Sequence, residues 1–156
     1  MEKAAIEYCL VIENLATYRG EQWLAEIGGV LPQIQKSMTQ YDDPNIEYGF
    51  FSLPDLEDRF KMYCMLKDRL GSYDEYWLHY DQQSVVGEMS GSLASDFSDI
   101  YFELKRGLNL LQIEGTSSAD VFSLWQTGFI LYWGEQLMSA QRHLSTILAT
   151  IKRQLQ

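Results

Sequence analysis

The sequence contains few cysteines, with only Cys9 and Cys64 among its 156 residues. They form no Cys-x-x-Cys pair and neither has a neighbouring histidine, which argues against a zinc site of the usual spacing and against a disulfide framework. We therefore predict two reduced thiols that face the core of a cytoplasmic protein.

Basic residues are also scarce, with 12 lysines and arginines against 22 acids and a net charge of −10. Contact with phosphate backbones requires a basic stripe, so DNA and RNA are not expected partners. The acids are concentrated in residues 40–103, which hold 14 of the 22 and, as bases, only Arg59, Lys61, Lys67 and Arg69. This segment predicts either a solvated acidic face or a surface that binds a basic partner or a cation.

Long apolar runs are absent as well. The longest stretch without charge is residues 121–134, which is shorter than the roughly 20 residues that cross a bilayer. The first ten residues contain no apolar core behind a basic start, so no signal peptide is expected. We expect no membrane partner and a cytoplasmic location.

Residues 117–155 carry the clearest positive signal, that of one long C-terminal helix. At about 100° per residue, one broad apolar stripe follows its length. The stripe consists of Phe122, Trp125, Phe129, Tyr132, Trp133, Leu137, Ala140, Leu144, Ile147 and Ile151. In the first half the opposite side is apolar too, which predicts burial on nearly every side for Leu124, Ile130, Leu131 and Met138. Residues 118–152 should form one helix, with any bend near Gly128 or Gly134.

Apolar periodicity predicts four further helices, at residues 2–18, 21–41, 54–70 and 92–113. In the third of these, the predicted core positions are Leu56, Phe60, Tyr63, Cys64 and Leu70. Residues 42–53 are expected to be a connection, and residues 71–90 an ordered excursion with one irregular helical turn. The predicted fold class is therefore all-α, with residues 1–156 as a single domain, a bundle of about five mostly antiparallel helices.

Three carboxylates share one flank of the predicted helix 92–113, because Asp96, Asp99 and Glu103 recur at i, i+3 and i+7. Their mutual repulsion requires compensation. The first interpretation is a local ion-pair ladder with Lys105 and Arg106. A bound divalent cation and a basic side chain of a partner are the alternatives.

Gly107 lies inside the same predicted helix, where a glycine costs about 1 kcal/mol relative to alanine. We therefore expect Gly107 to mark a close approach to another helix or to a large aromatic ring.

Motifs for catalysis are missing: the sequence has no Gly-x-Ser-x-Gly elbow, no Gly-rich phosphate loop and no Glu-x-x-His pair. We predict no catalytic, cofactor-binding or metal-binding residues. A second acidic pair, Asp55-x-x-Asp58, gives the chain a resemblance to all-helical nucleotide pyrophosphohydrolases, which gather Mg²⁺ between such pairs. This resemblance implies the alternative function, a metal-dependent hydrolase using carboxylates of the helices at 54–70 and 92–113.

Two stretches and a later tripeptide resemble a bacterial domain family of unknown function, made of small, acidic, all-helical proteins. They are YDEYWLHYD at 73–81, SLASDFSDIYFELKRGL at 92–108 and YWG at 132–134. The matching positions are Tyr73, Tyr76, Trp77, Asp81, Leu93, Asp96, Asp99, Ile100, Tyr101, Leu104, Lys105, Gly107, Trp133 and Gly134. The resemblance implies the helical fold and the place of a special surface, and it transfers no activity.

We interpret the chain as a soluble protein-interaction or regulatory module rather than an enzyme. A basic protein is the expected partner, and a homo-oligomer is compatible with the sequence. The candidate functional surface is acidic and aromatic, and it comprises Tyr73, Tyr76, Trp77, Asp81, Asp96, Asp99, Glu103 and Lys105.

Overall fold

The computed structural model describes residues 1–40, 55–78 and 89–156. The elements are, in order, α1 (Glu2–Glu13), α2 (Gln22–Thr39), α3 (Leu56–Leu70), β1 (Glu75–Leu78), β2 (Met89–Ser92), α4 (Leu93–Leu110), α5 (Ser118–Gly128) and α6 (Gly134–Gln154). Short 3-10 turns follow α1 at Leu15–Thr17 and α3 at Gly71–Tyr73, and a π-helix at Phe129–Trp133 joins α5 to α6. The predicted connection at 42–53 lies outside the described residues.

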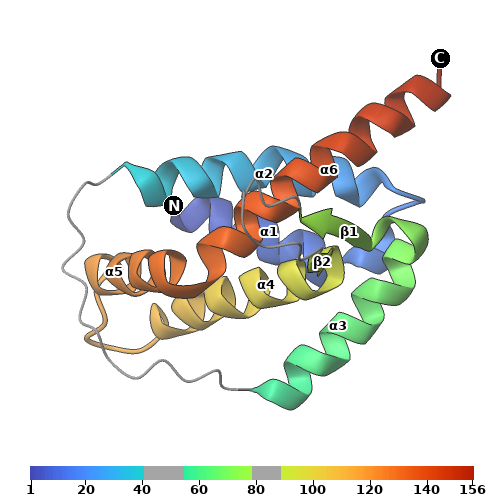
Figure 1. The fold of residues 1–156 in the computed structure, drawn as a ribbon. Coiled ribbons are helices and arrows are strands. Elements are labelled where there is room, and N and C mark those ends of the chain that lie inside the picture. The colour runs from blue at the N-terminus through green and yellow to red at the C-terminus, as the bar shows by residue number, and fades with distance from the viewer. Residues whose placement is uncertain (41–54, 79–88) are drawn as a thin grey trace.

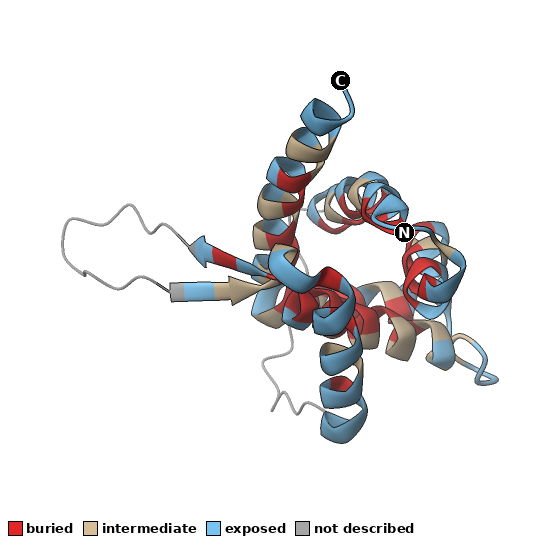
Figure 2. Cartoon of the chain, turned by 90° about the vertical axis from the view of Figure 1, so that its right-hand side faces the viewer, coloured by how far each residue is buried: buried red, intermediate tan, exposed pale blue. Residues whose placement is uncertain are grey.

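The predicted all-α bundle is confirmed (Figure 1). With α5, the π-helix and α6 counted as one C-terminal helix, the described part of the chain contains five α-helices. α4 is the central element, because it contacts α1, α3, α5 and α6. The Tyr8 hydroxyl donates a hydrogen bond of 2.8 Å to the Phe97 carbonyl and so ties α1 to α4. Buried residues lie on the inward faces of the helices (Figure 2).

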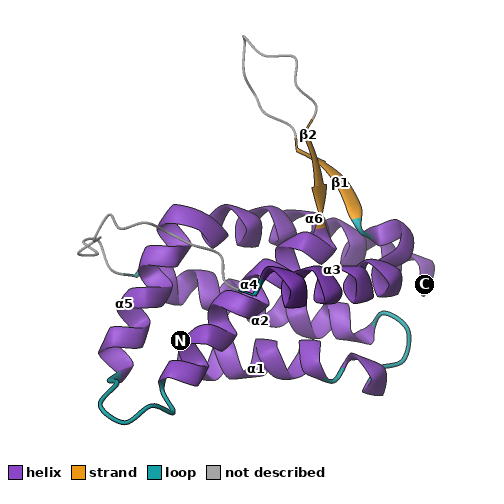
Figure 3. Ribbon diagram, turned by 90° about the horizontal axis from the view of Figure 1, so that it is seen from below, coloured by secondary structure: helices purple, strands orange, loops and turns teal. Residues whose placement is uncertain are grey.

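The C-terminal helix is continuous but not uniform. The capping box of Ser117 and Asp120 starts α5, and the π-helix closes with the Gly134 N–H donating to the Phe129 carbonyl. A Cβ atom on Gly134 would lie 2.3 Å from that carbonyl oxygen, so the wide turn requires glycine there. α5 and α6 run in different directions (Figure 3), which agrees with the predicted bend between Gly128 and Gly134.

The first half of this helix is less buried than the sequence predicts. Trp125, Phe129 and Trp133 are buried as expected, but Ile130, Leu131 and Met138 are exposed. The prediction of burial on nearly every side is therefore wrong. The physical reason is that, among the described residues, α4 packs against one side of this segment, so the apolar residues on the opposite side remain in contact with water.

Residues 71–90 were expected to form an ordered excursion with one irregular helical turn. A helical turn is present at Gly71–Tyr73, but the two strands that follow it were not predicted. β1 and β2 pair as an antiparallel hairpin that projects from the bundle (Figure 3), with Tyr76 opposite Gly91. A Cβ atom on Gly91 would lie 2.3 Å from Cζ of Tyr76, so the ring occupies the space above the glycine. The sequence EYWL suits a strand, because aromatic residues pack well on a pleated surface.

The orientation of α3 also differs from the prediction. Leu56 and Phe60 are 66% and 64% exposed, and Cys64 is exposed rather than core-facing. The buried residues of α3 are instead Arg59, Leu66 and Leu70. The physical reason is that α4 presents carboxylates to α3, and turning Arg59 towards them leaves Leu56 and Phe60 outside.

None of the helices in the described part of the chain combines the length and the apolar character required to cross a lipid bilayer.

Candidate functional site

The acidic flank of α4 is neutralised mainly by an arginine from α3. The Arg59 guanidinium donates to Asp99 Oδ1 at 3.1 Å and to Glu103 Oε1 at 2.7 Å. Arg59 and Glu103 are only 7% and 2% exposed. The Arg106 guanidinium donates to the second oxygen of Glu103 at 2.7 Å. The buried charges are thus paired within the protein, as interior charges generally are.

The predicted ladder is therefore partly correct. Arg106 pairs with Glu103 as expected, whereas Lys105 does not pair with the three carboxylates. It forms an ion pair with Glu13 of α1, which also accepts a hydrogen bond of 2.8 Å from the Tyr101 hydroxyl. Burial alone would raise the pKa of Glu13, but the hydrogen bonds from Lys105 and Tyr101 outweigh it and lower this pKa. The principal partner, Arg59, was missed because the predicted face of α3 was wrong.

Asp96 belongs to a different cluster, at the base of the hairpin. Its carboxylate accepts a very short hydrogen bond from the Tyr76 hydroxyl. The Tyr76 ring stacks on His143 of α6 with 4.8 Å between centroids, and His143 Nε2 lies 3.0 Å from the Tyr73 carbonyl oxygen. Burial raises the pKa of Asp96 to about 7, in spite of the Tyr76 hydrogen bond, which lowers it.

Asp74 fixes the other side of the hairpin base. Its carboxylate accepts hydrogen bonds from the Ser92 hydroxyl at 2.9 Å and from the Ala94 N–H at 2.7 Å. Asp74 therefore caps the start of α4 and holds the end of β2 at the same time. Because side chains alternate along a strand, Tyr76 faces the bundle while Glu75 and Trp77 share the outward face. Trp77 is 62% exposed.

The candidate surface residues thus occupy different environments. Tyr76, Asp96 and Glu103 are buried, and Tyr73, Asp99 and Lys105 are partly buried. Trp77 is exposed, and Asp81 lies outside the described residues. The structure brings Tyr73, Tyr76 and Asp96 together at the hairpin, whereas Asp99 and Glu103 lie in the Arg59 cluster and Lys105 faces α1. Any functional role of these eight residues remains a prediction.

The carboxylates of the hydrolase alternative do not converge in the described part of the chain. No group of three or more His, Cys, Asp or Glu side chains there has the geometry of a metal site. Arg59 forms ion pairs with Asp99 and Glu103, and the Tyr76 hydroxyl donates a hydrogen bond to Asp96. Nothing in this arrangement supports a metal-dependent hydrolase.

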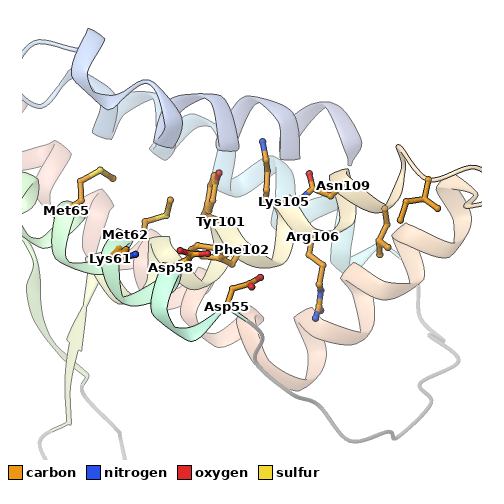
Figure 4. Close-up of a pocket in the computed structure, with 12 residues that line it drawn as sticks. Asp55, Asp58, Lys61, Met62, Met65, Tyr101, Phe102, Lys105, Arg106 and Asn109 are labelled. Atoms are coloured by element: carbon orange, nitrogen blue, oxygen red, sulfur yellow. The ribbon is translucent and has the colours of Figure 1, made fainter.

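An open cleft of about 580 Å³ lies between α3 and α4 (Figure 4). Its apolar lining comes from both helices and from the turn after α4, namely Met62, Met65, Phe102, Leu110 and Ile113. The charged residues of the lining are Asp55, Asp58, Lys61, Lys105 and Arg106. Asp55 and Asp58, which were considered as metal ligands, thus line this cleft.

Comparisons with known proteins agree with this fold. A family model described as a domain of unknown function (DUF5063) matches residues 1–150. The crystal structure of protein BF1032 from Bacteroides fragilis is similar, with a TM-score of 0.71 and 19% sequence identity over 94% of this chain and 88% of that chain. Such a low identity supports the fold alone, and a search of curated proteins finds no match. The expected membership of a helical family without known function is confirmed, and the chain belongs to the DUF5063 family of domains of unknown function.

Proposed function

We propose that this chain is a cytoplasmic protein-interaction or regulatory module, and that it binds a basic partner through the outward face of the β1–β2 hairpin. The observation that carries the proposal is the exposure of Trp77, at 62%, on a hairpin that projects from the bundle. Tryptophan side chains are strongly buried on average, and they are enriched among the residues at the centres of protein interfaces.

The hairpin is suited to binding because its base is held in place. Tyr76 contacts Asp96 and His143, and Asp74 holds Ser92 and the first turn of α4. A partner that contacts Trp77 therefore meets a side chain on an ordered strand, and less conformational entropy is lost on binding.

The chemistry of the outward face favours a lysine or arginine of the partner. Glu75 and Trp77 lie two residues apart on one face of β1, so a carboxylate and an indole ring are neighbours there. A cation over an indole ring contributes about 0.5–2 kcal/mol, and a carboxylate beside it adds a charged hydrogen-bond acceptor. Of this pair, Trp77 belongs to the acidic and aromatic surface predicted from the sequence, whereas Glu75 was not among its predicted residues.

The experiment is capture of partners from an extract of the native host on the immobilised chain, followed by mass spectrometry and titration of the captured protein. Trp77→Ala and Glu75→Gln should each reduce capture and weaken binding, the former at least about tenfold as for a central interface residue. Phe60→Ala removes a similarly exposed aromatic residue from α3 and is the matched control.

Fluorescence offers a direct readout, because Trp23, Trp125 and Trp133 are buried while Trp77 is exposed. Quenching by iodide should therefore report on Trp77, and a bound partner should protect it. Capture that is equally strong with both hairpin variants, or a bound partner that leaves quenching unchanged, would contradict the proposal.

A further inference from the structure

We infer that the cleft between α3 and α4 is a docking groove for an amphipathic helix with basic flanking residues, contributed by a partner protein. This groove involves neither Glu75 nor Trp77, so the inference is independent of the hairpin site. It rests on the shape of the cleft, the residues of its floor and the pairing of its charges.

The shape favours an elongated occupant. On α4 the lining extends from Tyr101 to Leu110, which corresponds to about 14 Å along a helix at 1.5 Å per residue, and Ile113 continues it beyond the end of the helix. On α3 it extends from Asp58 to Met65, or about 10 Å, and Asp55 continues it just before the helix. A groove of this length between two helices matches about three turns of a third helix.

The floor of the groove is apolar and adaptable. Met62 and Met65 of α3 and Phe102 of α4 line the cleft (Figure 4), and Leu110 of α4 belongs to the same lining. Met65 and Ile113 are left 46% and 57% exposed. Methionine side chains are flexible and polarisable, which is why they are frequent in grooves that receive the apolar face of a helix.

The charges of the groove are unevenly satisfied. Its three basic residues are all paired with acids that do not line it: Lys61 with Glu57, Lys105 with Glu13 and Arg106 with Glu103. Figure 4 shows Lys105 directed towards α1, away from the groove.

Asp55 and Asp58 form no ion pair with any described residue, and both line the groove. The uncompensated charge of the groove is therefore negative. Basic residues that flank the apolar face of an incoming helix would complement this negative charge, and acidic residues in the same places would be repelled.

The test uses two synthetic peptides of about three helical turns with the same leucine face, one flanked by lysines and the other by glutamates. The full chain carries labelled methionine methyl groups, so that Met62 and Met65 report on the groove by NMR. The lysine peptide should shift both methyl signals, and raised salt should weaken its binding. The glutamate peptide should bind at least about tenfold more weakly.

The double variant Asp55→Asn/Asp58→Asn should bind the lysine peptide at least about fivefold more weakly. Asparagine is suitable because Asp55 has a positive φ of 60°, which asparagine also tolerates. Asp68→Asn, which removes an exposed acid of α3 outside the groove, should leave binding unchanged, as should Trp77→Ala. A cooperative thermal unfolding transition is the check that each variant is folded. The inference would be overturned by equal binding of both peptides, by unshifted methyl signals, or by full binding of the lysine peptide to the double variant. Loss of peptide binding in Trp77→Ala would also overturn it, because the peptide would then bind at the hairpin.

Discussion

Gly107 of α4 lies directly beneath the indole ring of Trp125, so that a Cβ atom at position 107 would be 2.2 Å from Nε1 of the ring. The same Nε1 donates a hydrogen bond of 3.2 Å to the Glu103 carbonyl. The ring is buried, with α5 behind it, and cannot move aside without cost. The close approach to a large aromatic ring that the sequence predicted is confirmed.

Gly107→Ala should therefore destabilise the protein, by about 1–3 kcal/mol, although alanine favours helices. Gly29→Ala in α2 is the matched control, because a Cβ atom there meets nothing within 4 Å. It should stabilise by about 0.5–1 kcal/mol, since only helix propensity changes. Urea unfolding measures both, and effects of the same sign would contradict the role of Trp125.

Arg59→Ala should be one of the most destabilising single changes, at about 3–5 kcal/mol. It removes the guanidinium that pairs with Asp99 and leaves one oxygen of the buried Glu103 without its charged partner. Arg59→Lys should restore little, since one ammonium cannot reproduce two hydrogen bonds in fixed directions. Lys61→Ala removes an exposed ion pair with Glu57 and should change the unfolding free energy by less than about 0.5 kcal/mol. Chemical denaturation compares the three variants, and similar losses for Arg59 and Lys61 would be inconsistent with the buried pairing.

Divalent cations should not stabilise the protein through Asp99 and Glu103, because Arg59 already neutralises them. Addition of Mg²⁺, Mn²⁺ or Ca²⁺ should leave the melting temperature unchanged, and Asp99→Asn should lower stability modestly. A ligand that binds only the folded state would raise the melting temperature by mass action. Saturable binding in calorimetry that disappears with Asp99→Asn would support the cation alternative.

The contribution of Asp96 to stability should fall as the pH rises from about 4 to about 7. Burial raises the pKa of Asp96 to about 7 in the folded protein, whereas an aspartate in an unfolded chain titrates near pH 3.9, at about 1.4 kcal/mol per pKa unit. Between these values the folded state holds a proton that the unfolded state has released, so increasing pH favours unfolding.

The measurement for Asp96 is the difference in unfolding free energy between the wild type and Asp96→Asn at a series of pH values. The other titrating groups are shared by both proteins, so their contributions largely cancel. The wild type should lose stability relative to the variant between pH 4 and pH 7. A difference that does not vary over this range would show that Asp96 titrates normally.

The two cysteines should differ sharply in reactivity. Cys64 is exposed, whereas Cys9 is buried and its pKa is raised to about 12 by burial. A thiolate-specific reagent should modify Cys64 of the folded protein and leave Cys9 unmodified. Cys64→Ser should abolish the reaction until denaturant is added, and rapid modification of the folded variant would contradict the burial of Cys9.

The sequence predicted the bundle well because the signal came from long helices. The stripe through Trp125, Trp133 and Leu137 identified the C-terminal helix. The spacing i, i+3 and i+7 correctly placed Asp96, Asp99 and Glu103 on one side of α4, although Asp96 contacts the hairpin while Asp99 and Glu103 contact Arg59. Local periodicity is enough for predictions of this kind.

The partners of that flank could not be predicted, because they come from other elements. In α3 the apolar residues Leu56 and Phe60 suggested one face, but pairing of Arg59 with α4 selected another. The series Arg59, Met62, Leu66 and Leu70, at spacings of three and four, was the available signal, and it required treating an arginine as a core residue. The hairpin was missed because its second strand, MSGS, has little β-propensity and depends on Tyr76 covering Gly91.

The π-helix at Phe129–Trp133 means that the side-chain directions in α6 do not continue the 100° periodicity of α5. A π turn accommodates one residue more than an α turn, which rotates all later side chains by about 100° relative to the earlier ones. Without the π turn, Trp125 and Leu137, which are twelve residues apart, would differ in direction by about 120° and could not both face the core. Deletion of a single residue between Phe129 and Trp133 would compensate, because eleven residues of regular helix bring the two side chains back to within about 20° of each other. The protein should therefore tolerate a deletion there better than the deletion of one residue in the middle of α6.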